Sequence, residues 1–335
     1  MIVQVSPAQY RGQYGLWYLT KSAYGPGLSA LGGVFYETNE HVPFYGVGPA
    51  TNEGNKLHLH RHLLESEARV TYGFGTRGRF RAGVFGRYQN HYGIRTADVD
   101  PGARSRLDAR SEASLQATLA DPKTVATGAE AIYDSRSNLF NPRSGVLVQA
   151  GTMRTIHAAG AHFPAFWTRY GTFHVFLPVG LESTFMARLY VVDSDAKDGT
   201  PSVLLPVLDS SAGAGLHRNR FVTNDYVMLS AEYAKTLFDL SGTVAVDGVL
   251  GGYLFGAYDR LSQFTPTITL AGPSLSTRNL VPLRPAAGVG FRLYSYFLET
   301  TIVNVTLGFS RERIGLHGFS VVTDLRSTRP ALRGR

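Results

Sequence analysis

Apolar and polar residues alternate with a period of two in segment after segment of this 335-residue chain. Between residues 80 and 92, Phe80, Val84 and Tyr88 fall on one side of the alternation, and Arg81 and Arg87 fall on the other. Successive side chains of an extended strand point to opposite faces of a sheet, so this pattern predicts β-strands with one apolar and one polar face. Counting every such segment predicts an all-β fold with about 14 strands.

Two segments depart from the simple alternation. Phe85 is an aromatic residue on the polar side of its strand. Residues 104–122 hold the only stretch with helix-favouring composition, which we interpret as a loop or a connection between strands. The most apolar stretch, residues 240–258, contains Asp247 and five glycines and alternates, so it predicts a strand and its turn, not a transmembrane helix.

Two architectures accommodate many antiparallel strands of this kind. A soluble barrel or sandwich turns the apolar face inward, whereas a transmembrane barrel turns it to lipid and keeps the polar face in the lumen. The polar face here is rich in Gly, Arg, Glu, Ser, Thr and Asn. Aromatic residues gather near strand ends, and no helix is predicted to cover the sheet. These features favour a transmembrane antiparallel β-barrel of about 14–16 strands. A soluble ligand-binding β-barrel is the alternative.

Composition narrows the function classes. The net charge is +8, but the arginines are spread singly along strands without a nucleic-acid motif, so we predict no nucleic-acid partner. The absence of cysteine excludes disulfides, thiolate metal sites and thiol catalysis. No catalytic motif is recognisable, so we predict neither an enzyme nor a cofactor. His58, His60 and His62 share one side of a strand, and we interpret them as polar strand-end residues, not as metal ligands.

The sequence YDSRSNLFNPRSG, residues 133–145, forms a polar turn between two predicted strands. Asp134 and Arg136 are two residues apart and therefore share a face, where they can pair with lumen charges. Asn141 and Pro142 are suited to shaping the turn, and Gly145 supplies unrestricted backbone angles.

This turn resembles the Asp-Thr-Arg-x-Asn-x-x-x-Pro-x-x-Gly signature of the bacterial surface antigen domain, the membrane barrel of the BamA/TamA outer-membrane assembly family. The matching residues are Asp134, Arg136, Asn141, Pro142, Arg143 and Gly145. Four further stretches resemble family segments in the same order: FYGVGPATNE, GLHRNRFVTNDYVMLSAEYAKTLF, TVAVDGVLGG and AAGVGFRLYS. The resemblance covers nearly the whole chain.

The third of these five stretches is similar to a family loop that folds back into the lumen. The resemblance implies that Gly215, Arg218, Arg220 and Phe221 form this loop and that its arginines contact lumen carboxylates. The candidate carboxylates are Glu130, Glu232 and Asp247. Ala214 replaces the arginine that precedes the glycine in the family, and Leu216 replaces the following aromatic residue.

The resemblance also implies a location and a role. It implies a barrel over residues 1–325 in the bacterial outer membrane, with residues 326–335 as a basic, disordered tail. Its partners would be the lipid bilayer and client outer-membrane proteins, which it would assemble or translocate through a weak seam between first and last strands. The family barrel has 16 strands and follows periplasmic POTRA domains, and the chain opens without a signal peptide, so we expect an N-terminally shortened chain. The alternative role is a passive, anion-favouring pore or a structural barrel.

Overall fold

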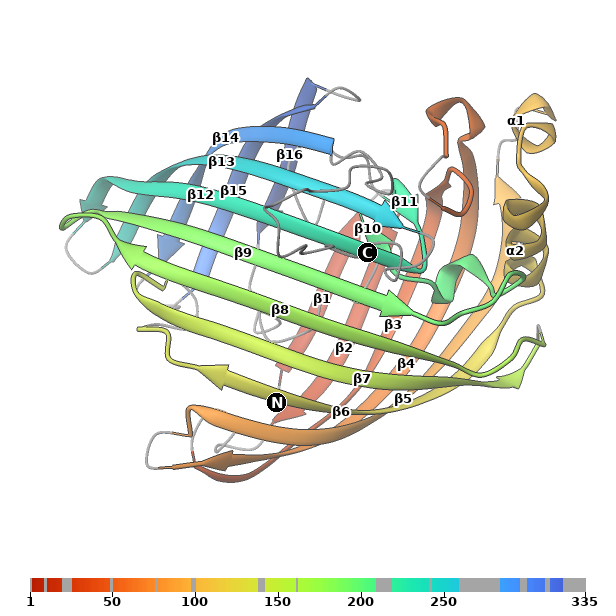
Figure 1. Cartoon of the computed structure of the whole chain (residues 1–335), viewed down its shortest axis with the longest axis horizontal. Helices are drawn as coiled ribbons and strands as arrows, with labels where there is room; N and C mark the ends of the chain where they lie inside the picture. The colour runs from red at the N-terminus through yellow and green to blue at the C-terminus, as the bar shows by residue number, and fades with distance from the viewer. Residues whose placement is uncertain are drawn as a thin grey trace, which may run out of the picture.

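The computed structural model confirms an all-β chain built on one large antiparallel sheet. It describes residues 2–8, 11–19, 26–48, 51–75, 78–97, 101–137, 142–160, 162–208, 219–240, 243–258, 284–295, 300–310 and 314–321. The sheet has 14 strands, within the predicted 14–16, and they follow one another around it in sequence order (Figure 1). Within the described residues, no pairing joins the first strand of this order to the last.

The strands of the large sheet are longest in its first half. Their bounds are β1 Ile2–Ala8, β2 Arg11–Leu19, β3 Gly27–Phe44, β4 Leu57–Phe74, β5 Phe80–Ala97, β6 Lys123–Asp134, β7 Gly145–Ala159, β8 Phe166–Pro178, β9 Ser183–Ser194, β12 Asp225–Leu240, β13 Val244–Tyr258, β14 Arg284–Ser295, β15 Thr300–Ser310 and β16 Ile314–Val321. A separate two-stranded ladder pairs β10 Val207–Leu208 with β11 Phe221–Val222.

The sheet curls with its polar face inward. On β4, Glu67 is 4% exposed and Arg69 is also buried, whereas Ala68 and Val70 face outward and Val70 is 44% exposed. The alternation predicted from the sequence is therefore present, and its apolar side forms the outer wall. An apolar outer wall around a charged interior is the arrangement of a transmembrane barrel.

Phe85, the exception in the alternation, lies inside the barrel. Its ring packs beneath two lumen cations, at 5.2 Å from the Arg69 guanidinium carbon and 5.9 Å from that of Arg87. Gly128 lies directly opposite on β6, and a Cβ atom there would approach the Phe85 ring to 2.5 Å. The glycine therefore leaves the space that the ring occupies, so this aromatic residue belongs to the lumen.

The two ends of the barrel differ. One end, which we call the turn end, has short connections such as residues 75–79, 135–144 and 179–182. The other, the loop end, has longer ones, including residues 45–56, 98–122 and 195–224 (Figure 1). The stretch interpreted as a connection, residues 104–122, does join β5 to β6, and most of it is helical.

Helices occur mainly in that connection. α1 spans Pro101–Ser105 and α2 spans Ala109–Leu119, and the short 3-10 turns η1 Glu53–Asn55 and η2 Ser202–Leu204 lie in neighbouring connections. α2 begins at Asp108, whose carboxylate accepts a hydrogen bond from the Ser111 amide at 2.7 Å. None of the described helices is long and apolar enough to cross a membrane.

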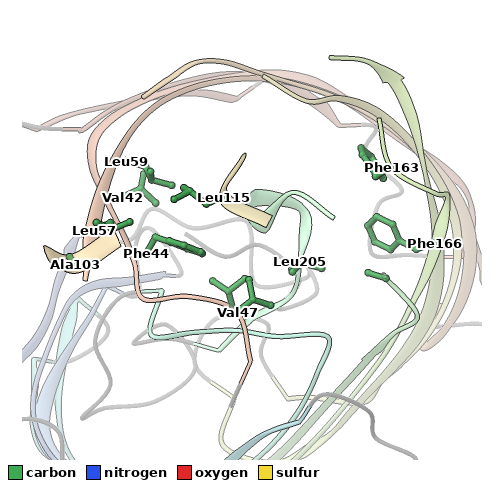
Figure 2. Close-up of a cluster of buried hydrophobic side chains, with 12 residues drawn as sticks. Val42, Phe44, Val47, Leu57, Leu59, Ala103, Leu115, Phe163, Phe166 and Leu205 are labelled. Atoms are coloured by element: carbon green, nitrogen blue, oxygen red, sulfur yellow. The ribbon is translucent and has the colours of Figure 1, made fainter. Parts of the chain in front are cut away.

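An apolar core fills part of the barrel interior at the loop end. Figure 2 shows side chains from the wall strands β3 and β4 gathered with others from α2 and the long connections. Its members are Val42, Phe44, Val47, Leu57, Leu59, Ala103, Leu115, Phe163, Phe166, Ala196, Leu205 and Val222. We call the part of this core that α1, α2 and the long connections contribute the plug, because it occupies lumen space that water would fill in an open pore.

Candidate functional site

The turn over residues 133–145 places the charges of its described residues in the lumen at the turn end. Arg136 donates to both carboxylate oxygens of Asp134, through Nε at 2.9 Å and Nη2 at 2.8 Å. Arg81 on β5 approaches the same carboxylate at 3.5 Å. All three side chains are buried, so the Asp134 carboxylate has two cationic neighbours inside the barrel.

The backbone of this turn extends the β6–β7 hairpin. The amide of Ser135 donates to Val146 and that of Ser137 to Ser144, both at 2.9 Å. The hydroxyl of Ser137 accepts from the amide of Arg143 at 3.1 Å. Gly145 has φ +109°, the left-handed region that favours glycine. Pro142 lies just before this ladder, and Asn141 lies outside the described residues.

Arg143 connects the turn to a distant part of the wall through hydrogen bonds. Its Nη2 donates to Thr236 Oγ1 on β12 at 2.8 Å and to Asp247 on β13 at 3.1 Å. Thr236 also donates to Asp247, at 2.9 Å. Since β8 and β9 lie between β7 and β12 in the sheet, the turn forms a strut between wall segments that are not neighbours.

Glu232 on β12 is the centre of a second charge group at this end. Its buried carboxylate accepts hydrogen bonds from Arg188 on β9, at 3.0 Å, and from Arg292 on β14. Arginines outnumber carboxylates in the turn-end groups together. The arginines are Arg81, Arg136, Arg143, Arg188 and Arg292, and the carboxylates are Asp134, Glu232 and Asp247.

A third group lies deeper along the wall and is almost fully buried. Glu67 accepts from Arg69 at 3.2 Å and from Arg87 at 3.1 Å. Arg69 also bonds to Glu130, whose other oxygen accepts from Gln149 at 3.0 Å. Each charged group therefore has at least one opposite charge within contact distance, which a low-dielectric environment requires.

The predicted lumen loop is described only at its end. Gly215 and Arg218, together with Ala214, lie outside the described residues. Arg220 is 3% exposed and donates to Thr51, through Nη1 to the hydroxyl at 2.8 Å and through Nη2 to the carbonyl at 2.9 Å. Its guanidinium lies 4.4 Å from the centre of the Phe221 ring. These contacts attach the loop to the β3–β4 connection, and Glu130, Glu232 and Asp247 bind the other arginines described above.

Hydrogen bonds to one face of α2 hold the connections of the plug in place, and this role of α2 was not predicted from the sequence. The Ser111 hydroxyl accepts from the Val47 amide at 2.8 Å, and the Ser114 hydroxyl donates to the Thr200 carbonyl at 2.7 Å. Thr118 accepts from the Ser202 amide at 2.7 Å. Residues at positions 111, 114 and 118 share one face of a helix, so their spacing in the sequence was a readable signal.

A backbone ladder completes the plug. β10 and β11 pair with each other, and the Gly48 amide donates to the Val222 carbonyl at 2.7 Å. The connections after β3 and β9 and helix α2 are thereby joined into one body inside the loop end.

Comparison with known proteins gives a likeness of fold. No family model matches the sequence, and no curated protein matches it. BamA from Haemophilus ducreyi lacking POTRA domains 1–3 has a similar solved structure, at a TM-score of 0.56 and 10% identity over 94% of this chain and 62% of that one. CdiB from Escherichia coli matches at 0.51 and 12% identity, over 91% and 51%. The chain has the fold of these barrels. It spans less than two thirds of either one's length.

Proposed function

We propose that this chain is a bacterial outer-membrane β-barrel that takes part in the assembly or translocation of outer-membrane proteins. The likeness to BamA and CdiB supports the barrel type and the location. The apolar core that fills part of the lumen at the loop end is the observation that favours this role over a passive pore, because a steady pore needs an unobstructed lumen. Clients would engage the sheet edges at β1 and β16.

The outer wall has the dimensions of a membrane span. Near the turn end, exposed aromatic residues form one band: Tyr72, Phe74, Phe80 and Tyr133. Near the loop end, Tyr14, Tyr36, His62 and Tyr92 form another. On β4 the bands lie at Tyr72 and His62, and about ten residues rising about 3.3 Å each on a strand tilted by about 40° give a height of about 25 Å. That is the height of the apolar band of outer-membrane barrels.

Gel migration tests the membrane claim. We expect the protein refolded in detergent to migrate differently before and after boiling, because a large sheet of hydrogen-bonded strands resists the detergent until it is heated. A protein that stays folded and monodisperse in buffer without detergent would contradict a barrel whose outer wall is apolar. The unboiled and boiled samples of one preparation serve as each other's control.

Conductance in planar bilayers separates assembly from passive transport. We expect low conductance from the native chain and a several-fold increase when Ser111, Ser114 and Thr118 are all changed to alanine, because the connections after β3 and β9 then lose their hydrogen bonds to α2. Ser105→Ala is the matched control, since that hydroxyl is exposed and bonds only within α1's turn. A steady, anion-selective pore in the native chain would instead favour passive transport. The excess of arginines at the turn end would suit the passage of anions.

A folding assay tests the assembly role directly. Vesicles containing the native chain should fold a urea-unfolded eight-stranded outer-membrane barrel faster than empty vesicles, as followed by the heat-sensitive gel shift of the client. Vesicles containing an unrelated outer-membrane barrel are the control for bilayer defects. Equal client folding in both kinds of vesicle would remove the assembly role and leave the barrel assignment intact.

A further inference from the structure

A row of stacked rings crosses four neighbouring strands on the outer wall at the loop end. Tyr14 on β2 stacks on Tyr36 of β3 with ring centres 6.1 Å apart, and Tyr36 stacks on His62 of β4 at 6.2 Å. His62 in turn stacks on Tyr92 of β5 at 5.2 Å. Tyrosine and histidine are amphipathic rings, so this row marks the boundary between the apolar band and the headgroup layer.

Further histidines lie between this row and the loop end. A hydrogen bond of 3.0 Å joins the Nε2 atoms of His60 and His62, and the Tyr36 hydroxyl lies 2.9 Å from Nδ1 of His62. The rings of His41 and His58 meet edge to face at 5.5 Å. Since these histidines are farther from the apolar band than the ring row, they lie at the level of lipid headgroups.

The charged groups around this cluster are mostly cationic or able to become so. Arg95 is exposed on β5 directly opposite His60, and Glu40 on β3 is the carboxylate that faces the same histidine. The other titratable groups here are His41, His58 and His62, with the phenols of Tyr36 and Tyr92. Within the described residues, no three histidines or carboxylates are placed to hold a metal ion.

We propose that this outer-wall cluster binds the phosphate of an anionic lipid headgroup, with Arg95 and His60 as its principal donors. Arginine pairs with phosphate oxygens, and the imidazole N–H groups add donors at the same level. The ring row positions the lipid by contacting its glycerol and upper acyl region. The inference rests on the membrane location in the proposed function but not on the assembly role.

Native mass spectrometry of the detergent-solubilised chain tests the proposal, with phosphatidylglycerol and phosphatidylcholine as the probes. We expect preferential retention of phosphatidylglycerol over phosphatidylcholine. The double variant His60→Gln, Arg95→Gln should weaken that retention roughly tenfold. Arg169→Gln is the matched control, because Arg169 is also exposed at the loop end, on β8, but is paired with Asp193 at 2.6 Å.

Four results would overturn the proposal. Equal retention of phosphatidylglycerol by the native chain and the double variant would exclude the cluster as the site. An equal loss in Arg169→Gln would show a general effect of surface charge. Displacement of phosphatidylglycerol by millimolar inorganic phosphate would show a free-anion site and not a lipid site. A native chain that keeps its heat-sensitive gel shift while lacking any lipid preference would refute this site alone, since the gel shift reports the membrane barrel separately.

Discussion

Replacing Glu67 with alanine should lower the free energy of unfolding by about 3–5 kcal/mol. Glu67 is buried in the lumen and accepts hydrogen bonds from Arg69 and Arg87, which are themselves buried. Arg69 keeps Glu130 as a partner, but Arg87 keeps only Glu65 at 3.8 Å and loses the carboxylate that accepts from both its Nε and its Nη2. Buried guanidinium N–H groups that lose their carboxylate acceptor are the source of the expected cost.

Urea unfolding of the barrel in lipid vesicles, followed by tryptophan fluorescence, measures this cost. The control is Glu112→Ala in α2, which removes an ion pair with Arg104 in which both side chains are more than a third exposed. Solvent screens that pair, so its loss should cost less than about 1 kcal/mol. Similar losses for the two variants would show that the lumen wall is as well solvated as the outside of the loops.

Changing Gly145 to alanine should destabilise the barrel by at least about 2 kcal/mol. The residue has φ +109°, and an added Cβ would overlap the carbonyl oxygen of Ser135 and lie 2.7 Å from Cα of Arg136. The hairpin ladder would have to open to relieve this overlap. Because Arg143 lies two residues earlier, the strut to Asp247 should weaken as well.

Gly180→Ala separates backbone strain from overlap. Gly180 lies in the β8–β9 turn with φ +80°, but an added Cβ there has no atom within 4 Å. It should therefore cost only about 1 kcal/mol, from the left-handed backbone alone. The same urea unfolding assay serves both variants, and a cost for Gly145→Ala no larger than that for Gly180→Ala would rule out the overlap.

The wall of this barrel is predictable from sequence because its signal is local. Alternation with period two needs only neighbouring residues, and it correctly places Glu67 inside and Val70 outside. The sequence shows that Phe85 departs from the alternation. It does not show why, because Gly128, which leaves space for the ring, lies on another strand. The helix-favouring composition of residues 104–122 could be recognised for the same reason, since it also depends only on neighbouring residues.

The lumen contacts were not predictable because they join distant parts of the chain. Arg143 and Asp247 are 104 residues apart, and nothing near either one indicates the other. The resemblance pointed to arginines of the inserted loop as partners for the lumen carboxylates. Among the described residues, Arg220 bonds to Thr51, and wall arginines and Arg143 bond to Glu130, Glu232 and Asp247. Arg218 lies outside the described residues, so its part of the prediction stays a prediction.

The sequence order of the strands also sets an order of folding. Each strand of the wall pairs with its neighbours in the chain, apart from the step from β9 to β12, so the wall can form hairpin by hairpin. The plug instead needs contacts across 84 residues, from Thr118 to Ser202, and across 169, from Thr51 to Arg220. Closing such long loops is slow. We therefore expect the wall to form first and the plug to fill part of its interior only afterwards.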